Sequence, residues 1–195
     1  MIGLIILAAG ASTRLGTPKQ LLPYEGKSLL RHAAETALAS SCRPLVVVLG
    51  SNPAPLRLEL EGLPVHCVEN PDWEQGMGSS IRAGMKALLA ASGPEREAAL
   101  FMLCDQPHVS AALIDALIAA YRQTVSPLVA SEYGGTLGVP ALFDRSLFSE
   151  LSLLNGAEGA KQILQRHRAQ AIGIPFPKGT VDIDTPEDYL RLKKT

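Results

Sequence analysis

Two cationic residues and a series of small residues follow the first apolar run of the chain. The run from Ile2 to Leu7 leads directly into the segment LAAGASTRLGTPK, residues 7–19. Small residues at the end of a strand leave backbone N–H groups open to an anion, because no side chain intervenes. Arg14 and Lys19 place two fixed positive charges beside that anion. This pattern predicts a phosphate-binding loop.

The spacing of these residues excludes three known loop motifs of similar composition. A Walker A loop needs Gly, four residues and then Gly-Lys-Ser/Thr, but Gly10 and Gly16 are too far apart. A dinucleotide fingerprint needs a third glycine three residues after the second, which this loop lacks. A nucleophile elbow needs a closing glycine two residues after its serine, where Arg14 follows Ser12. The remaining alternative is a strand-to-loop turn whose cations bind no ligand.

Acidic residues follow two later apolar runs. Asp105 comes just after Ala98–Leu103. Asp182 lies within the short run at residues 181–183, and Asp184 follows that run. Mg²⁺ binds one or two carboxylates together with phosphate oxygens and waters, so Asp105 suits a metal site beside the phosphate loop. Asp182 and Asp184 share one face of an extended chain, and either residue could complete that site. The structural alternative is that Asp105 caps the turn before residue 110 and Asp184 serves the last helix.

A long glycine-bearing loop, NPDWEQGMGSS at residues 70–80, precedes a helical pattern. Its Ser79 and Ser80 either cap that helix or bind a base or ribose. We expect Trp73, the single tryptophan, to pack rather than to stack on a ligand. The four histidines show no metal-ligand spacing and no arrangement with Ser or Cys that is typical of nucleophilic catalysis.

The composition limits the classes of protein that fit. The chain has 195 residues, of which 47% are hydrophobic and 19% charged, so we expect one domain over residues 1–195 with a sizeable core. The net charge of −1 argues against a general nucleic-acid or membrane surface. Cys42, Cys67 and Cys104 predict reduced thiols in a cytoplasmic protein. The first apolar run predicts a strand rather than a signal peptide, and no run reaches the ~18 apolar residues of a membrane span.

Short apolar runs alternate with helical patterns along the chain. The expected strands are Gly3–Ala8, Leu45–Leu49, Val65–Glu69, Ala98–Leu103, Leu128–Ser131, Ala171–Ile174 and Val181–Ile183. The expected helices are Ser28–Ser40, Pro53–Glu61, Ser79–Ala91, Ser110–Thr124, Arg145–Leu154, Ala157–Arg168 and a last one with Thr185 as N-cap and Pro186 at its first position. The alternation predicts an α/β fold whose mostly parallel sheet is covered on both faces. Ligands of such sheets bind beyond the carboxyl ends of the strands, where the segments described above fall.

Taken together, these segments resemble the MobA-like nucleotidyltransferase family, in particular its molybdenum cofactor cytidylyltransferase branch. The opening pattern of the family, Leu-Ala-Ala-Gly-x-Ser-x-Arg-x-Gly-x-x-Lys, is met in full by residues 7–19. The Asp-Gln-Pro of residues 105–107 and the Asp-Ile-Asp-Thr-Pro-Glu-Asp of residues 182–188 also recur in that branch. The likeness spans nearly the whole chain and is more specific for the superfamily than for the substrate.

The resemblance implies a Rossmann-like, three-layer α/β/α fold and a nucleotidyl-transfer reaction. A phosphate of the acceptor attacks the α-phosphorus of a nucleoside triphosphate, and pyrophosphate leaves without a protein nucleophile. The implied substrates are CTP and molybdopterin, the implied ion is Mg²⁺, and a molybdoenzyme is the implied transient partner. Catalysis then consists of positioning and charge stabilisation.

The resemblance also assigns roles to residues of this chain. Arg14 and Lys19 clamp the triphosphate and stabilise its developing charge. Asp105 binds Mg²⁺, with Asp184 as the second acid. The residues that line the nucleotide pocket are Leu7, Ala8, Ala9, Gly10, Ser12, Gly78, Ser79 and Ser80.

One position in the opening loop bears on the choice of base. Relatives that transfer a guanylyl group usually read Leu-Ala-Gly-Gly, where this chain has Ala9. A methyl group there narrows the pocket beside the base. We therefore expect CTP rather than GTP.

Two departures from the family pattern concern the acceptor. The branch usually has His or Asn where this chain has Val139, and it reads Gly-Asp-x-Gly-Ala-Arg where residues 156–161 read Gly-Ala-Glu-Gly-Ala-Lys. Two alternatives therefore remain. The first is the same chemistry with GTP, or on a sugar phosphate or another phosphorylated metabolite. The second is a non-catalytic partner that holds molybdenum cofactor and delivers it to a target enzyme.

Overall fold

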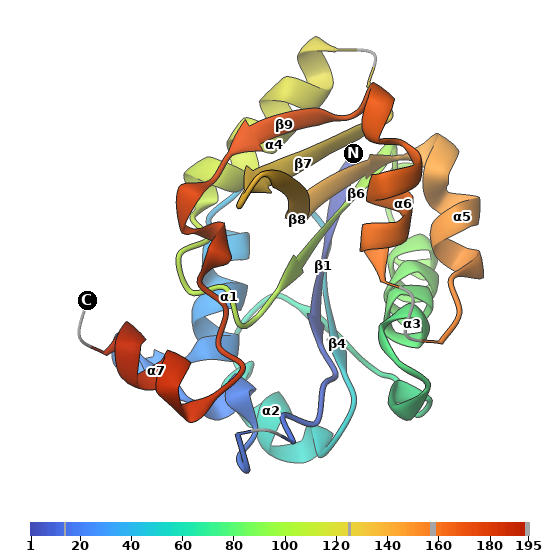
Figure 1. Cartoon of the computed structure of the whole chain (residues 1–195). Helices are drawn as coiled ribbons and strands as arrows, with labels where there is room; N and C mark the ends of the chain where they lie inside the picture. Colours follow the sequence, from blue (N-terminus) through green and yellow to red (C-terminus); the bar gives the residue numbers. More distant parts are fainter. Residues whose placement is uncertain (14, 125, 157–158, 194–195) are drawn as a thin grey trace.

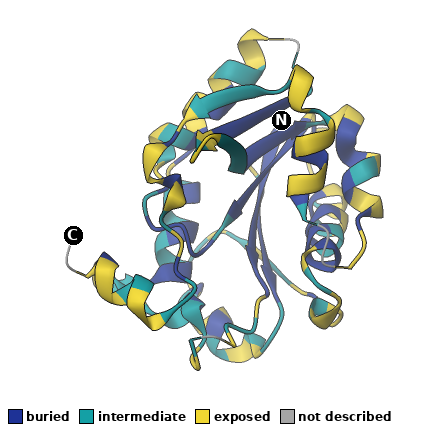
Figure 2. Ribbon diagram, viewed as in Figure 1, coloured by how far each residue is buried: buried dark blue, intermediate teal, exposed yellow. Residues whose placement is uncertain are grey.

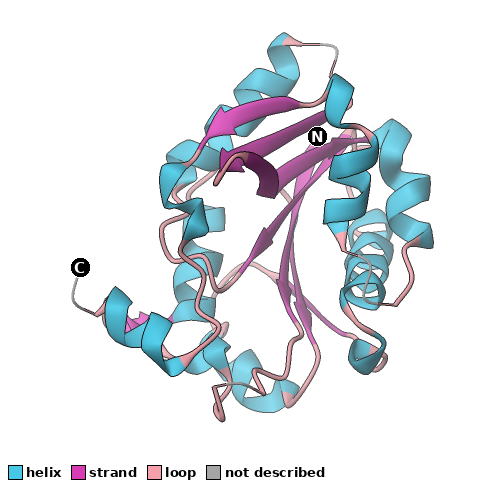
Figure 3. Cartoon of the chain, in the orientation of Figure 1, coloured by secondary structure: helices cyan, strands magenta, loops and turns pink. Residues whose placement is uncertain are grey.

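The computed structural model describes residues 1–13, 15–124, 126–156 and 159–193 (Figure 1). Within these residues a seven-stranded sheet forms the centre of the molecule. Its strands are β1 (Ile2–Ala8), β4 (Leu45–Leu49), β5 (His66–Glu69), β6 (Ala98–Leu103), β7 (Leu128–Tyr133), β8 (Thr136–Asp144) and β9 (Ile172–Pro175). Helices lie on both sides of it (Figure 3).

The strand order is β5-β4-β1-β6-β8-β7-β9, and β5, β4, β1 and β6 are parallel neighbours. Among the described strands of this sheet, only β8 runs in the opposite direction to the others, since it pairs antiparallel with both β6 and β7. β9 is again parallel to β7. The predicted α/β fold with a mostly parallel sheet is confirmed.

Alternate residues of β1 serve two separate cores, one on each face of the sheet. Leu4 and Ile6 belong to the core closed by α1 (Leu29–Leu38), α2 (Pro53–Glu59) and α4 (Ala111–Gln123). Ile5 belongs to the other core, which is closed by α3 (Met77–Ala90), α5 (Phe148–Leu153) and α6 (Ala160–Arg166). The sheet is buried between these layers, and the exposed residues lie mainly on the outer helix surfaces and loops (Figure 2). This arrangement is the expected three-layer α/β/α fold.

A third, smaller apolar cluster fastens the end of the chain. Ile183 and Leu192 pack with Leu29 beneath α7 (Pro186–Leu192), next to the short hairpin of β2 (Pro23–Tyr24) and β3 (Lys27–Ser28). The predicted strand Val181–Ile183 is wrong, because the structure places this segment outside the sheet. The apolar side chain of Ile183 packs in this cluster, where it is fully buried, and does not belong to a strand.

β8 was not predicted from the sequence, and neither was the short hairpin of β2 and β3. Gly134 and Gly135 have φ values of +56° and +72° and form a two-residue turn between the paired Tyr133 and Thr136. Such a turn requires positive φ at both central positions, which glycine adopts without strain. β7 accordingly extends beyond the predicted end at Ser131.

The other predicted helices and strands agree with the structure apart from shifts at their ends. α3 begins at Met77 instead of Ser79, and α6 begins at Ala160, while the predicted start at residue 157 lies outside the described part of the chain. Ser110 caps α4, as predicted. Thr185 and Asp188 form a capping box at the start of α7, as the predicted cap requires.

The three cysteines are free thiols, and burial raises the pKa of both Cys42 and Cys104 to about 12. Both thiols are therefore protonated at neutral pH. In the part of the chain that the structure describes, no helix combines the length and the apolar character that crossing a membrane requires.

Candidate active site

A cavity of about 370 Å³ opens at the carboxyl ends of β1 and β6, the edge where the sequence predicts a ligand. The loop of residues 7–13 forms one wall together with Lys19. Met77 and Ser80 at the start of α3 form another, and Asp105 borders the cavity after β6. Segments far apart in the sequence thus surround one space.

Gln20 determines the shape of the loop. The residue is 1% exposed, and its Nε2 donates hydrogen bonds to the carbonyl oxygens of Ala8 at 2.9 Å and Gly10 at 2.8 Å. The backbone N–H of Lys19 donates to Oγ of Ser12 at 3.0 Å. The loop therefore folds around a buried amide. Sequence reasoning assigned no role to Gln20, since its interactions are visible only in the folded loop.

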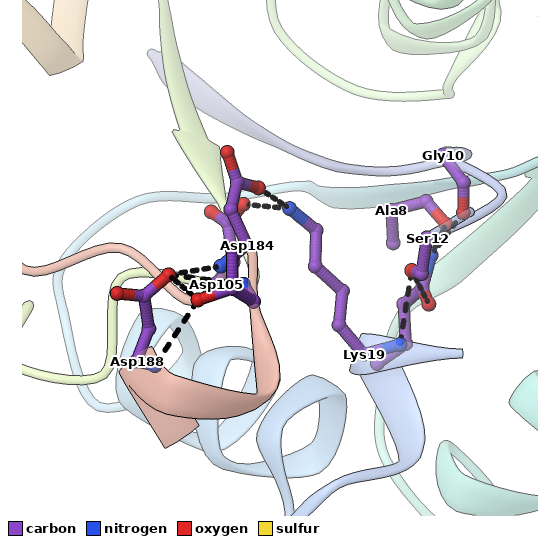
Figure 4. A network of polar contacts seen from close by, with 9 residues as sticks. Ala8, Gly10, Ser12, Lys19, Asp105, Asp184 and Asp188 are labelled. Carbon is purple, nitrogen blue, oxygen red and sulfur yellow. Dashed lines mark hydrogen bonds and ion pairs between the residues drawn. The ribbon is translucent and has the colours of Figure 1, made fainter. Parts of the chain in front are cut away.

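Lys19 joins the loop to two acidic segments. Its ammonium donates a hydrogen bond to Oδ2 of Asp105 and another to Oδ1 of Asp184 at 2.9 Å (Figure 4). Burial opposes the charge on Lys19, but the negative charge of Asp105 and the hydrogen bonds to both carboxylates outweigh it. The pKa of Lys19 is consequently raised above its ordinary value, and the ammonium is charged at neutral pH.

Asp105 retains one carboxylate oxygen for another ligand. The residue is 7% exposed, and its buried Oδ1 has no hydrogen-bond partner among the described residues. Burial and the charges of Asp184 and Asp105 raise the pKa of the neighbouring Asp182. The described residues contain no group of three or more His, Cys, Asp or Glu side chains arranged for a metal. A divalent cation that also binds phosphate oxygens and waters needs only one or two carboxylates from the protein.

The structural alternatives for the two acids can be compared with the geometry. Thr185 and Asp188 cap α7, whereas the carboxylate of Asp184 contacts Lys19. Ser110, not Asp105, caps α4. The carboxylates of Asp105 and Asp184 therefore contact the ammonium of Lys19, and neither caps a helix.

The predicted serines at the start of α3 have different surroundings. Ser80 lies on the cavity wall, whereas Oγ of Ser79 lies 2.8 Å from the carbonyl oxygens of Asp72 and Gly76. The N–H of Gly78 donates to the carbonyl oxygen of Gly156 at 3.2 Å. Neither serine is the N-cap, which is Gly76. Gly78 and Ser79 thus make contacts within the protein, whereas Ser80 borders the cavity and also accepts a hydrogen bond from Nδ2 of Asn70 at 3.1 Å.

Arg14 lies outside the residues that the structure describes, as does Ala157. Trp73 is half-buried, packs against the apolar core and also borders the cavity, in keeping with the packing role expected for it.

A second cavity, of about 240 Å³, adjoins the first and shares Leu7, Met77 and Leu103 with it. Leu137 and Val139 of β8 contribute to its largely apolar wall, and Lys161 lies on it as well. Val139 and Lys161, which both differ from the residues usual in the family, therefore lie on this second cavity.

The hydroxyl of Tyr133 links the wall of the second cavity to the segment that follows β6. It donates a hydrogen bond to the carbonyl oxygen of Val139 at 3.0 Å and accepts one from Nε2 of Gln106 at 3.4 Å. Gln106 follows Asp105 directly in the chain. The wall of the second cavity is thus hydrogen-bonded to the segment that carries the acid.

Known proteins share this sequence pattern. The family model described as the MobA-like NTP transferase domain matches residues 4–171. Nicotine blue oxidoreductase of Paenarthrobacter nicotinovorans is 34% identical over 96% of this chain and 94% of its own. The molybdenum cofactor cytidylyltransferase of Escherichia coli (strain K12) is 24% identical over 99% and 96%. The molybdenum cofactor guanylyltransferase of Rhodobacter capsulatus is 29% identical over 96% and 92%.

Solved structures share the fold. Rv0371c from Mycobacterium tuberculosis H37Rv has a TM-score of 0.81 and 30% identity, covering 100% of this chain and 98% of that one. A second structure of Rv0371c, in complex with manganese, has a TM-score of 0.78 and 28% identity with the same coverage. A nucleotidyl transferase from Methanothermobacter, at 22% identity and a TM-score of 0.82 over 100% and 96% of the chains, shows the same Rossmann-like fold.

Proposed function

Because the chain belongs to the family of MobA-like NTP transferase domains, we propose that it moves a CMP group from CTP to the phosphate of molybdopterin. In this reaction an oxygen of the acceptor phosphate forms a bond to the α-phosphorus of CTP. The bond between that phosphorus and the bridging oxygen to the β-phosphorus breaks, and pyrophosphate leaves with the electron pair. The family makes the protein a nucleotidyltransferase, and the choice of nucleotide and acceptor is our proposal.

The contact of one ammonium with two carboxylates beside the first cavity carries this proposal. Negative charge spreads over the phosphate oxygens during phosphoryl and nucleotidyl transfer, so fixed cations lower the barrier when they are already in position. Lys19 is charged and lines the cavity. The loop of residues 8–13, held by Gln20, gives the triphosphate a preformed wall.

The acids suit a divalent cation, which we propose to be Mg²⁺. Asp105 has a buried, unpartnered oxygen among the described residues, and Asp184 approaches from a second segment. Together they would hold the ion, which would neutralise charge on the phosphate oxygens when bound. The manganese complex of Rv0371c supports a divalent cation in this family.

Ala9 supports CTP as the nucleotide. Its side chain lies on the wall of the first cavity and is 6% exposed. Gly50 packs closely against this methyl group, because a Cβ atom added at Gly50 would lie only 2.7 Å from Cβ of Ala9. The relatives named for cytidylyl and guanylyl transfer are 24% and 29% identical to this chain, so the proposal of CTP depends on Ala9.

The second cavity supports an acceptor that presents flat ring faces to a largely apolar wall. Leu137, Val139 and Phe101 form much of its wall. A polyhydroxylated sugar phosphate would leave hydroxyl groups without partners against such a wall, at a cost in free energy. Molybdopterin has a fused-ring body and a phosphate, so it fits the two adjoining cavities better. A molybdoenzyme would then receive the product.

Pyrophosphate release tests the proposed function. We expect release only when CTP, Mg²⁺ and molybdopterin are present together, with an equal amount of a cytidylylated product detected by mass spectrometry. Preference for GTP would overturn the choice of nucleotide, and release with a sugar phosphate alone would overturn the acceptor. Tight binding of molybdopterin without turnover of any triphosphate would favour the non-catalytic carrier.

A further inference from the structure

The ammonium of Lys19 occupies the space between the two carboxylates that we assign to the divalent cation. Nζ donates a hydrogen bond to Asp105 and lies 2.9 Å from Oδ1 of Asp184 (Figure 4). The side chains of Lys19, Asp105 and Asp184 are only 17%, 9% and 32% exposed. Water therefore competes weakly for these contacts, and the attraction is stronger than at a surface. The free protein supplies its own cation at this place.

The backbone of Lys19 is fixed, so only its side chain can move the charge elsewhere. Its N–H is bonded to Ser12, and the next residue, Gln20, is bonded to the carbonyl oxygens of Ala8 and Gly10. Lys19 also lines the first cavity. Rotation about its side-chain bonds can therefore transfer the ammonium between the carboxylates and a ligand in that cavity.

We propose that Lys19 is an exchangeable internal cation that holds Asp105 and Asp184 until a triphosphate draws it away and a divalent cation replaces it. This inference rests on the proposed function, because it takes a nucleoside triphosphate as the ligand of the first cavity. A divalent cation that binds without nucleotide must compete with the ammonium for the charge of both acids. Once the ammonium contacts phosphate oxygens, the same acids present their full charge to the metal.

The consequence is that metal and nucleotide bind cooperatively. Each ligand strengthens the binding of the other by the same factor, because coupling free energies are reciprocal. Without nucleotide, the affinity of the protein for a divalent cation is weak, and the positive charge of Lys19 is the cause. Removal of that charge must then strengthen metal binding, even though it removes a group that binds the nucleotide.

Binding of Mn²⁺ in the absence of nucleotide tests this inference, with the electron paramagnetic resonance signal of the free ion as the readout. Lys19→Met removes the charge and keeps a side chain of similar length, and we expect it to bind Mn²⁺ about tenfold more tightly than the unaltered protein. Lys19→Arg keeps the charge and should bind Mn²⁺ as weakly as the unaltered protein. Lys27→Met is the matched control, because Lys27 pairs with Glu35 and not with the two acids.

Further measurements keep the test decisive if Lys19→Met fails to fold. Lys19→Gln, which keeps a hydrogen-bond donor toward Asp105, then takes its place.

In the unaltered protein, the ¹⁵Nζ resonance of Lys19 should shift on addition of CTP and stay unchanged with millimolar Mg²⁺ alone. Neutral variants that bind Mn²⁺ no more tightly, or a shift caused by Mg²⁺ alone, would overturn the inference. These experiments need no turnover, so their failure is distinguishable from an absence of nucleotidyl transfer.

Discussion

The backbone N–H of Ile183 donates a hydrogen bond to the carbonyl oxygen of Asp105 at 3.2 Å. This contact joins the segment after β6 to the segment before α7, and it brings Asp184 beside Asp105. The side chain of Ile183 is fully buried against Leu29 and Leu192. A small apolar cluster thus positions the second acid of the site.

Truncation of Ile183 should impair both stability and the site. Ile183→Ala leaves a cavity and should lower the free energy of unfolding by about 2–4 kcal/mol. Because Asp184 follows directly, the variant should also lose affinity for Mg²⁺ and the triphosphate. Ile114→Ala, in the core around α4 and also fully buried, is the control. Urea unfolding should show similar losses for both variants, while the kinetic loss is confined to Ile183→Ala. Equal kinetic effects would contradict the positioning role.

Gln20→Leu should unfold the phosphate loop without a large change in side-chain volume. The leucine cannot donate to the carbonyl oxygens of Ala8 and Gly10, so we expect a loss of about 1–3 kcal/mol in the free energy of unfolding. KM for the triphosphate should rise as well. Gln75→Leu removes an exposed amide that bonds Asp72 and should change stability by less than about 0.5 kcal/mol. If the two variants unfold at the same urea concentration, Gln20 does not hold the loop.

Ala9→Gly should shift the nucleotide preference toward GTP. The change removes the methyl group from the cavity wall, so the ratio of kcat/KM for GTP to that for CTP should rise about tenfold, as one methyl group allows. Ala99→Gly is the control, because Ala99 is fully buried in the same core as Ala9 and is not among the residues that line the first cavity. An unchanged ratio in Ala9→Gly, or the same change in both variants, would refute the role of Ala9.

Tyr121 and Asp144 form a hydrogen bond at the end of the sheet opposite the cavity. Tyr121→Phe should therefore lower the free energy of unfolding by an amount that depends on pH. Burial opposes the charge on Asp144, but hydrogen bonds from Tyr121, at 2.6 Å, and from Ser146 lower the pKa of this carboxyl. A carboxyl with a lowered pKa stabilises the fold above its ordinary value near 3.8, and this contribution is lost as the pH falls through the folded pKa. We expect a difference of about 1 kcal/mol at neutral pH. Urea unfolding near pH 3 should show a smaller difference, and transfer activity should be unchanged. A difference that grows on acidification would contradict this assignment.

Most of the fold follows from local patterns in the sequence. Buried runs such as Leu45–Leu49 and Ala98–Leu103 have the bounds that the sequence predicts. β8 was missed because Pro140 and three glycines suggest a loop, although Gly134-Gly135 is itself a hairpin signal.

The predicted strand at residues 181–183 failed for another physical reason. A short apolar run before an acid predicts strand pairing and tertiary packing equally well, and only the folded structure shows that Ile183 packs beneath α7.

The candidate site was predictable in its residues and not in its contacts. The loop pattern and the acids after strands give Lys19, Asp105 and Asp184. The hydrogen bonds of Gln20 and the ammonium shared by two acids depend on segments that meet only in three dimensions. Ser79 shows the converse, since its hydroxyl contacts the carbonyl oxygens of Asp72 and Gly76 rather than the cavity.

Pyrophosphate release by Asp105→Asn tests the central claim most directly. The change keeps the shape of the side chain and removes the charge that contacts Lys19 and would bind Mg²⁺. With CTP, Mg²⁺ and molybdopterin, the unaltered protein should release pyrophosphate and form an equal amount of cytidylylated product. Asp105→Asn, folded by circular dichroism, should do so about 100-fold more slowly. Undiminished release by Asp105→Asn, or no release by the unaltered protein with any nucleoside triphosphate, would contradict the proposed reaction.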